Sequence, residues 1–216
     1  MRRRAPMAAI AAAVAVVVAM AAGCGDSGHS GEAAAGTHGD HASTAAQGFE
    51  GGVVSPRREA PPLQLTDIDG KAVDIRDLRG HPVLVTFVYA NCPDVCPLIM
   101  ENLHRVRELA GPLGKRMRVI AVSVDPAGDT PAVVRRFLAA HQVRSFVDYG
   151  IGDRATLERV WADWQVSTQA PKDDPEAIEH SSLIYGVTAG GELATAYPVG
   201  FEAESIARDL PLLARS

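Results

Sequence analysis

The chain has 216 residues, with 21 Lys and Arg against 26 Asp and Glu, and its formal net charge is −5 at pH 7. Loss of an N-terminal signal carrying Arg2, Arg3 and Arg4 would change that charge to about −8. An acidic protein without a cluster of Lys and Arg offers no electrostatic basis for holding phosphates, so nucleic-acid binding is excluded.

Residues 1–23 have the pattern of a secretory signal peptide. Met-Arg-Arg-Arg precedes an uncharged run over 7–22, which is shorter than the roughly 20 residues that span a bilayer. Ala21-Ala22-Gly23-Cys24 resembles the bacterial lipobox, in which the cysteine becomes the lipidated first residue of the mature protein. We therefore expect a lipoprotein held by Cys24 on the extracytoplasmic face of the bacterial cell membrane, where disulfides persist. The alternative is an ordinary signal peptide or a short uncleaved anchor, with Cys24 free.

Residues 24–54 are expected to form a flexible tether. They are mainly Gly, Ala, Ser, Thr and His, and they hold almost no large apolar side chain that could repay the entropy of ordering. His29, His38 and His41 lie in this tether; such tracts can bind metal loosely, but solvated histidines are the more common case, and the sequence assigns these three no role. Residues 55–216 have a globular composition and suit one domain.

Turn signals and apolar runs predict the strands of this domain. Residues 63–73 have the pattern of a β-hairpin, with Asp69-Gly70 as its turn. Residues 83–89 are β-branched or aromatic apart from Leu84, and this near-continuous apolar run indicates a strand buried on both faces. The other predicted strands are 117–124 and 147–151, and a closing hairpin made of 182–187 and 193–199.

Apolar residues at helical spacing predict four helices between and after these strands. They are marked by Ile99, Leu103, Val106 and Ala110; by Val134, Phe137, Leu138 and His141 after a start at Asp129-Thr-Pro131; by Leu157, Val160, Trp161 and Trp164; and by Ile206, Leu210 and Leu213. This order predicts an α/β domain with a mixed, mostly parallel sheet flanked by helices and preceded by an N-terminal β-hairpin. The thioredoxin-like three-layer fold has this order of elements.

Cys92 and Cys96 lie where the central strand gives way to the first helix. The positive end of a helix dipole favours a thiolate, which is both the nucleophile of disulfide exchange and a soft ligand for copper(I). Cysteines four residues apart in a helical turn can also form a disulfide. A static bridge over so short a loop would stabilise the fold little. Spacing alone leaves redox chemistry and metal binding equally supported.

A metal site needs a third ligand, and the histidines offer it. His81, His104 and His141 have positions that suit packing or solvation. His180 differs, because it precedes a strand that should lie beside the strand ending near Cys92. It is the best candidate for a third ligand.

Three motifs then occur in an order that resembles one family. They are Cys92-Pro-Asp-Val-Cys-Pro97, Val122-Ser-Val-Asp-Pro126 with Asp129-Thr-Pro131, and His180-Ser181 before an apolar strand. The sequence resembles the SCO/SenC family, copper-binding accessory proteins of cytochrome c oxidase assembly with a thioredoxin-like fold. The departures are Tyr89-Ala-Asn before the cysteines and Ala127-Gly128 in a slot that is often charged.

The resemblance implies that Cys92, Cys96 and His180 bind copper and that Asp125 lies in the second shell of the site. Asp125 followed by Pro is otherwise a common turn after a strand. The resemblance also implies delivery of copper to the receiving subunit of cytochrome c oxidase at the membrane surface. The lipid on Cys24 would then replace the membrane helix that is usual in the family. A monomer is the default expectation.

Two functions remain. A copper chaperone, a binding protein without turnover, would use two thiolates and an imidazole, and it requires a reduced Cys92–Cys96 pair. A thiol–disulfide reductase would use the same pair as its redox-active disulfide, on the oxidase subunit or on other exported proteins. Dedicated thioredoxins have two residues between the cysteines and a proline opposite them, whereas this chain has three and His180. The sequence favours the chaperone, and a peroxidase is a weaker hypothesis still.

Overall fold

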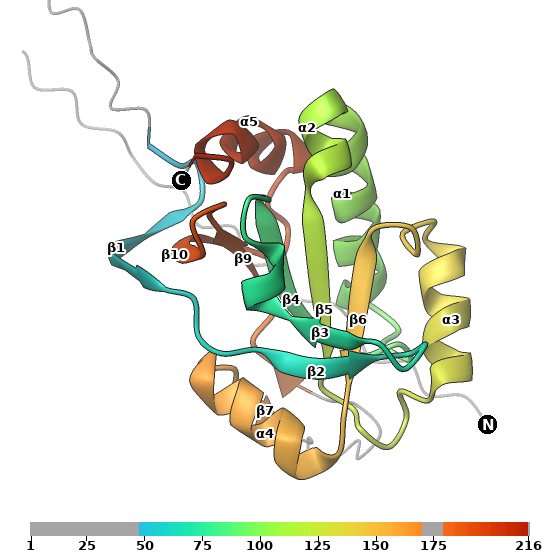
Figure 1. Cartoon of the computed structure of the whole chain (residues 1–216). Coiled ribbons are helices and arrows are strands. Elements are labelled where there is room, and N and C mark those ends of the chain that lie inside the picture. Colours follow the sequence, from blue (N-terminus) through green and yellow to red (C-terminus); the bar gives the residue numbers. More distant parts are fainter. Residues whose placement is uncertain (1–47, 170–178, 216) are drawn as a thin grey trace, which may run out of the picture. The chain divides into compact units, whose positions relative to one another are not determined.

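The computed structural model describes residues 48–169 and 179–215. The predicted signal peptide, Cys24 and the tether histidines His29, His38 and His41 lie outside the described residues. Figure 1 shows the described strands and helices coloured in chain order.

Eight strands form the main sheet of the domain. They are β1 (Gly52–Glu59), β2 (Gln64–Asp67), β3 (Ala72–Asp74), β4 (Val83–Val88), β5 (Arg118–Ser123), β6 (Val147–Ile151), β9 (Leu183–Val187) and β10 (Glu192–Pro198). Their order across the sheet is β1-β10-β9-β4-β5-β6-β2-β3. β4 is central, and all six of its residues are buried, as its continuous apolar sequence predicts. A second, two-stranded sheet joins β7 (Thr168–Gln169) to β8 (Glu179–His180).

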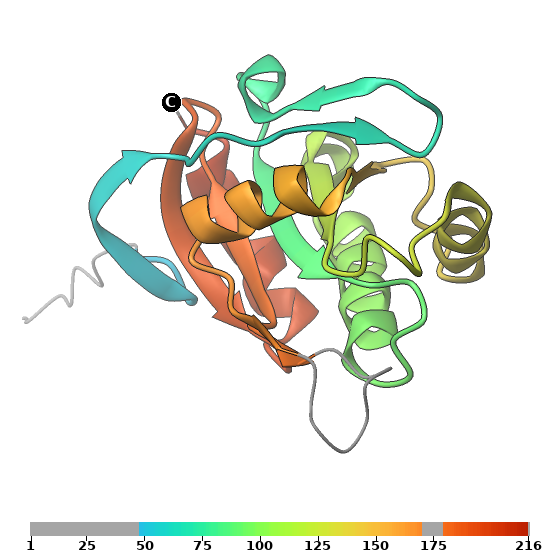
Figure 2. The same cartoon turned by 90° about the horizontal axis from the view of Figure 1, so that it is seen from below.

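Helices cover both faces of the main sheet. They are α1 (Val95–Leu109), α2 (Gly111–Arg116), α3 (Pro131–Ala140), α4 (Arg154–Asp163) and α5 (Ala203–Leu213), with a short 3-10 helix η1 (Ile75–Leu78) after β3. Figures 1 and 2 show α1 and α5 side by side on one face and α4 across the other. The expected α/β fold with helices flanking a mixed sheet is therefore confirmed.

The expectation that the sheet would be mostly parallel is wrong. Only β4–β5 and β5–β6 pair in parallel among the described strands. Antiparallel strands extend the sheet on both sides, with β9, β10 and β1 on one side and β2 and β3 on the other. A parallel pair needs a crossover helix, and α1 and α3 supply the two crossovers of this sheet.

The predicted N-terminal hairpin is present as β2 and β3. These strands pair antiparallel, with Leu65 opposite Val73. Gly70 has φ of 82°, the left-handed conformation that the Asp-Gly turn requires. Strand β1, helix α2 and the β7–β8 pair were not predicted. β1 begins at Gly52, ahead of the boundary at residue 55 that composition indicates.

A buried carboxylate attaches the chain ahead of β1 to the rest of the domain. Asp209 of α5 is 2% exposed. It accepts hydrogen bonds from the backbone N–H groups of Glu50 at 2.9 Å and Gly51 at 3.2 Å, and from the hydroxyl of Tyr197 at 2.8 Å. These contacts make the residues around β1 part of the folded domain, although their composition is that of a tether.

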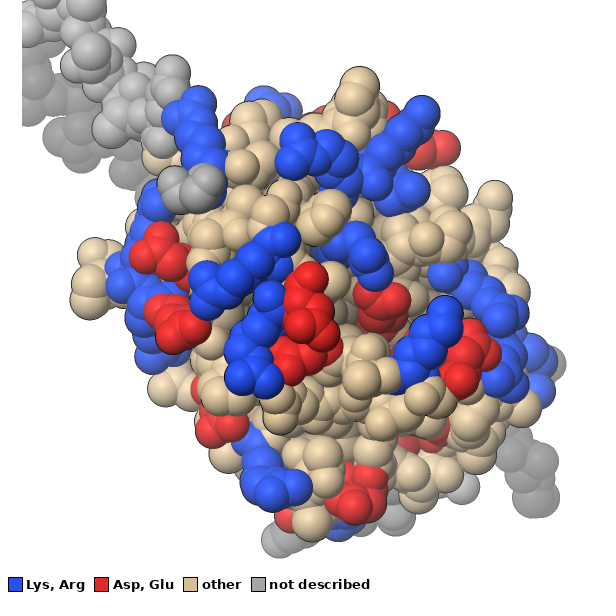
Figure 3. Space-filling view, viewed as in Figure 1, with Lys and Arg blue, Asp and Glu red and all other residues tan. Residues whose placement is uncertain are grey.

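Charges of both signs share the surface over β2 and β3. Figure 3 shows Lys and Arg beside Asp and Glu on this face. The ion pairs of this region include Arg76–Asp74 at 2.6 Å and Arg79–Glu59 at 2.9 Å. Among the helices that the structure describes, none has the length and apolar character needed to cross a membrane.

Candidate functional site

The two cysteines lie where β4 passes into α1. The backbone N–H of Cys92 donates to the carbonyl of Tyr89 over 3.2 Å and closes a turn. α1 begins at Val95, so Cys96 lies in its first turn, which contains no acidic side chain. Both cysteines are free thiols; Cys96 is fully buried and Cys92 is 8% exposed. The site therefore has one thiol that solvent reaches and a second one enclosed by the protein.

A hydrogen bond between the two thiols separates their acidities. The contact with Cys96, helped by the backbone N–H groups of Asp94 and Cys96, lowers the pKa of Cys92 to about 5 against the opposing effect of burial. The same contact, together with burial, raises the pKa of Cys96. The shifts favour the thiolate on Cys92 and the thiol on Cys96. The N-terminus of α1 favours a sulfur anion in the same way.

Buried Asp129 positions the loop that carries Cys92. Its carboxylate is 4% exposed and accepts hydrogen bonds from the backbone N–H of Ala90 at 2.8 Å, the hydroxyl of Ser123 at 2.6 Å and the hydroxyl of Tyr149 at 2.7 Å. Ala90 follows β4, Ser123 ends β5 and Tyr149 lies in β6. Burial raises the pKa of Asp129, and these hydrogen bonds oppose that shift. One side chain therefore joins three neighbouring strands just ahead of the thiols.

The role of Asp129 in the site is not visible in the sequence. Asp129-Thr-Pro131 predicts a helix start, and Thr130 does cap α3 by accepting from the N–H of Val133. The cap by Thr130 is enough to explain the Asp-Thr-Pro motif, so the motif gives no sign that Asp129 is buried. The contact with Ala90 depends on the pairing of β4 with β5, which no spacing along the chain reveals.

Asp125 lies at the same end of the sheet but folds back onto its own turn. Its Oδ1 accepts from the N–H groups of Ala127 at 3.2 Å and Gly128 at 2.9 Å. A Cβ on residue 128 would lie 2.0 Å from Oδ2 of Asp125, so this conformation requires the glycine. The place of Asp125 in the second shell of a metal site stays a prediction.

The backbone places His180 near the edge where β4 ends. β9 runs antiparallel to β4, with Ile184 opposite Thr86, so the segment before β9 emerges beside the end of β4. His180 lies in β8 and pairs with Thr168 of β7. The N–H of Ser181 also donates to the carbonyl of Ser167 at 3.1 Å. The side chain of His180 lies outside what the structure describes.

An aromatic cluster fixes the chain that leads into β7. The ring of Trp164 packs against Tyr185 at a centroid distance of 5.3 Å and against Phe87 at 6.0 Å. The hydroxyl of Tyr185 donates to the carbonyl of Trp164 at 3.2 Å. Because Phe87 belongs to β4 and Tyr185 to β9, the cluster locks α4 and β7 onto the two strands that frame the site.

The other described histidines have partners elsewhere. His81 Nδ1 lies 2.9 Å from the carbonyl of Arg116, and His104 Nδ1 lies 3.3 Å from that of Gln142. His141 packs its ring on Phe137, and its Nδ1 lies 3.8 Å from Glu101. Among the side chains that the structure describes, no three His, Cys, Asp or Glu residues group in a way that could hold a metal ion.

The fold and the site define a class of protein. It is a thioredoxin-like α/β domain with a free CxxxC pair at the start of the helix that follows its central strand. The chain belongs to the SCO1/SenC family, whose model matches residues 54–215.

Relatives from bacteria and mitochondria are similar to this chain in sequence. The protein SCO2 of Saccharomyces cerevisiae mitochondria is 26% identical over 149 residues, which cover 67% of this chain and 49% of the yeast protein. The SCO1 protein homolog of Bacillus subtilis is 26% identical over 143 residues, 64% of this chain and 73% of that protein. The chain thus spans about half the length of its yeast relative.

Solved structures confirm the fold. Bradyrhizobium japonicum ScoI with copper bound is 32% identical, with a TM-score of 0.62 over 72% of this chain and 99% of that one. Apo Sco1 from Thermus thermophilus is 26% identical, with a TM-score of 0.66 over 76% of this chain and 96% of that one.

Replacing Asp129 with Ala should destabilise the domain strongly. The change removes the acceptor of Ala90 and Ser123, while Tyr149 keeps only a hydrogen bond of 3.3 Å to the carbonyl of Val88. Each buried donor left without an acceptor costs about 1–3 kcal/mol. We expect the free energy of unfolding, measured by urea denaturation, to fall by about 3 kcal/mol or more. Asp163→Ala, at an exposed aspartate of α4, is the control and should change it little. Equal stability of the two variants would contradict the role of Asp129.

Alkylation of the reduced protein should begin at Cys92. Because the pKa of Cys92 is about 5, its alkylation rate should level off well below neutral pH, while Cys96 stays unmodified. Peptide mapping by mass spectrometry after brief iodoacetamide treatment at a series of pH values measures both rates. Cys96→Ala removes the thiol hydrogen bond and should move the midpoint for Cys92 upward. A midpoint that does not move would show that this bond does not set the acidity.

Proposed function

We propose that this chain is a copper-binding accessory protein that delivers copper to cytochrome c oxidase during assembly of its copper centre. The observation that carries the proposal is the pair of free thiols, one ionised and one enclosed, at the end of β4 beside the start of β9. Membership of the SCO1/SenC family and the likeness to copper-bound ScoI support it.

The chemistry of the donors suits copper. Thiolates are soft ligands that select copper(I), and an imidazole completes a three-coordinate site. We assign these roles to Cys92, Cys96 and His180. Cys96 must lose its proton before it can act as a ligand, and its raised pKa makes loading depend on pH. Copper is the cargo of such a site, so the site must release the ion to a partner as well as bind it.

A second function fits the same pair, namely thiol–disulfide reduction. The lowered pKa of Cys92 supports it, because a thiolate attacks a target disulfide and forms a mixed disulfide with it. Loss of the proton from Cys96 would let that sulfur displace the reduced target and leave a Cys92–Cys96 disulfide. Such oxidation removes both copper ligands, so the two functions exclude each other in one molecule at one time.

His180→Ala separates these functions. The full chain in detergent, reduced and titrated with copper(I) against a competing chelator, should bind near one equivalent. His180→Ala should bind at least about a hundredfold more weakly, because losing even an outer partner of a metal ligand costs about 10–100-fold. His104→Ala is the matched control and should bind as wild type. Unchanged binding by His180→Ala, with disulfide reduction lost in Cys92→Ser, would support the reductase instead.

We further propose that a lipid on Cys24 holds the protein at the extracytoplasmic membrane surface. The lipobox-like Ala21-Ala22-Gly23-Cys24 supports this proposal. Mass spectrometry of the protein extracted from membranes should find the chain starting at Cys24 with a diacylglycerol-type modification. Cys24→Ser should release the protein from the membrane fraction. An unmodified Cys24 thiol in the extracted protein would refute the lipid anchor.

A further inference from the structure

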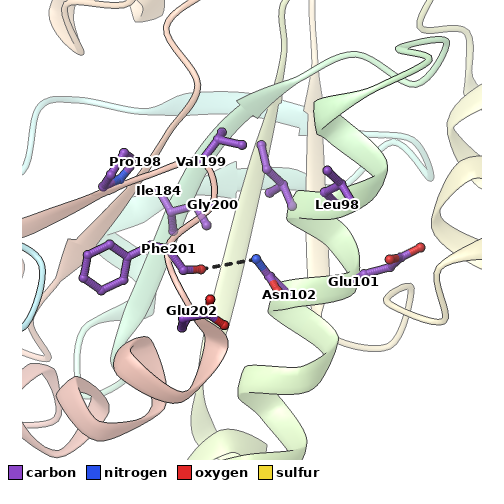
Figure 4. A pocket seen from close by; sticks show the side chains of 10 residues that line it. Leu98, Glu101, Asn102, Ile184, Pro198, Val199, Gly200, Phe201 and Glu202 are labelled. Atoms are coloured by element: carbon purple, nitrogen blue, oxygen red, sulfur yellow. Dashed lines mark hydrogen bonds between the residues drawn. The ribbon is translucent and has the colours of Figure 1, made fainter. Parts of the chain in front are cut away.

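A surface pocket of about 290 Å³ lies between α1 and the loop that joins β10 to α5. Figure 4 shows Leu98 and Asn102 on the helix facing Val199 and the backbone carbonyl of Phe201 on the loop, while the ring of Phe201 points away from the helix. The side-chain amide of Asn102 donates to the carbonyl of Phe201 at 3.3 Å. The loop is therefore fixed to the helix, and the pocket is preformed.

Both walls of this pocket are connected to the copper-binding segments. On the helix side, Ile99 lies about one turn beyond Cys96. On the loop side, the N–H of Val199 donates to the carbonyl of Ser182 at 3.2 Å, just beyond His180 in the chain. A molecule seated in the pocket would thus contact the elements that carry the proposed ligands.

The apolar residues of the pocket form an anchor site. Ile99 and Ile184 at its floor are only 2% and 3% exposed, whereas Leu98 at its edge is 51% exposed. Sites for small molecules usually enclose about 300–1,000 Å³, so this pocket lies at their lower limit. An apolar side chain from another protein, held in a pocket with surrounding contacts, matches the pattern of interface hot spots.

The charges around the pocket are negative. Glu101 and Glu202 line it with exposed side chains, and exposed Asp94 lies between the two cysteines. The stretches 80–104 and 173–207, which supply the pocket and the thiols, contain no Lys or Arg. Arg105, the next cation along α1, is paired with Glu204. The complementary partner surface is therefore basic.

We propose that this pocket is the docking site for the copper-receiving protein, and that it takes an apolar side chain of that protein flanked by Lys or Arg. The proposal rests on the copper-delivery function proposed above. It goes further by naming the surface that the partner occupies and the chemistry of the contact.

The rate of copper transfer to the partner tests the docking site directly. The copper(I)-loaded full chain in detergent is mixed with the metal-free copper-receiving domain of the oxidase subunit from the same organism, and the second-order rate is followed by stopped flow. Leu98→Asp should slow transfer about tenfold or more, and Leu98→Ala severalfold, as expected for a hot-spot residue. Glu101→Lys and Glu202→Lys should slow it and weaken its dependence on salt.

The matched controls lie on the same helix. Leu109 is 48% exposed toward the other end of α1, and Glu108 carries an exposed side chain there. Leu109→Asp and Glu108→Lys should transfer copper at the wild-type rate. All variants should keep the wild-type copper affinity and melting temperature, because none of these residues is a proposed ligand and all are at the surface.

Four results would overturn the docking site. Wild-type transfer rates in Leu98→Asp, or equal slowing in Leu109→Asp, would reject the pocket while leaving copper delivery in place. A dimer in sedimentation that dissociates in Leu98→Asp would show that a second copy covers the pocket instead. A wild-type chain that binds no copper(I) would reject copper delivery, and this docking proposal with it.

Discussion

The carboxylate of Asp129 is the interaction on which the site depends. A charge buried without partners would be too costly to keep, and here three donors from three neighbouring strands compensate it. Because one donor is the N–H of Ala90, the backbone just ahead of Cys92 cannot move without breaking this group. The thiols gain a fixed position although the residues between β4 and α1 form a loop.

Because the two thiols are held in fixed positions, their burial and their pKa values can differ. Cys96 lies inside the first turn of α1 with a raised pKa, while Cys92 is partly accessible and has a lowered pKa. In the proposed copper site both sulfurs would bind without their protons, and the proposed disulfide exchange would begin from the Cys92 thiolate. One reduced state would therefore serve both proposed chemistries. Which of them follows would be decided by whether a copper ion or a disulfide reaches Cys92 first.

Local patterns allowed much of this site to be predicted from the sequence. The buried strand before Cys92, the helix after Cys96 and the strand after His180 each follow from apolar periodicity within a few residues. Features that depend on contacts between distant parts of the chain were not predicted. Asp129-Thr-Pro131 predicts only a helix start. β1 was not predicted, because most of its residues are exposed and its partner is the distant β10, and its residues 52–54 fell within the expected tether. β9 lies beside β4, as expected for the strand that follows His180. The sheet as a whole, however, has more antiparallel than parallel pairs, whereas a mostly parallel sheet was expected.

The register of β1 shows where along the sheet the N-terminal end of the strand is attached. Gly52 pairs with Ala196, which pairs with Tyr185, and Tyr185 lies opposite Val85, so these residues form one row across the sheet. Glu59, at the other end of β1, pairs with Glu192 at the far edge from the thiols. The chain thus joins the sheet level with Val85, in the middle of β4, and Asp209 holds it there through Glu50 and Gly51. Tension on Glu50 and Gly51 will therefore act first on Asp209 of α5 and only then on the pairing of β1 with β10.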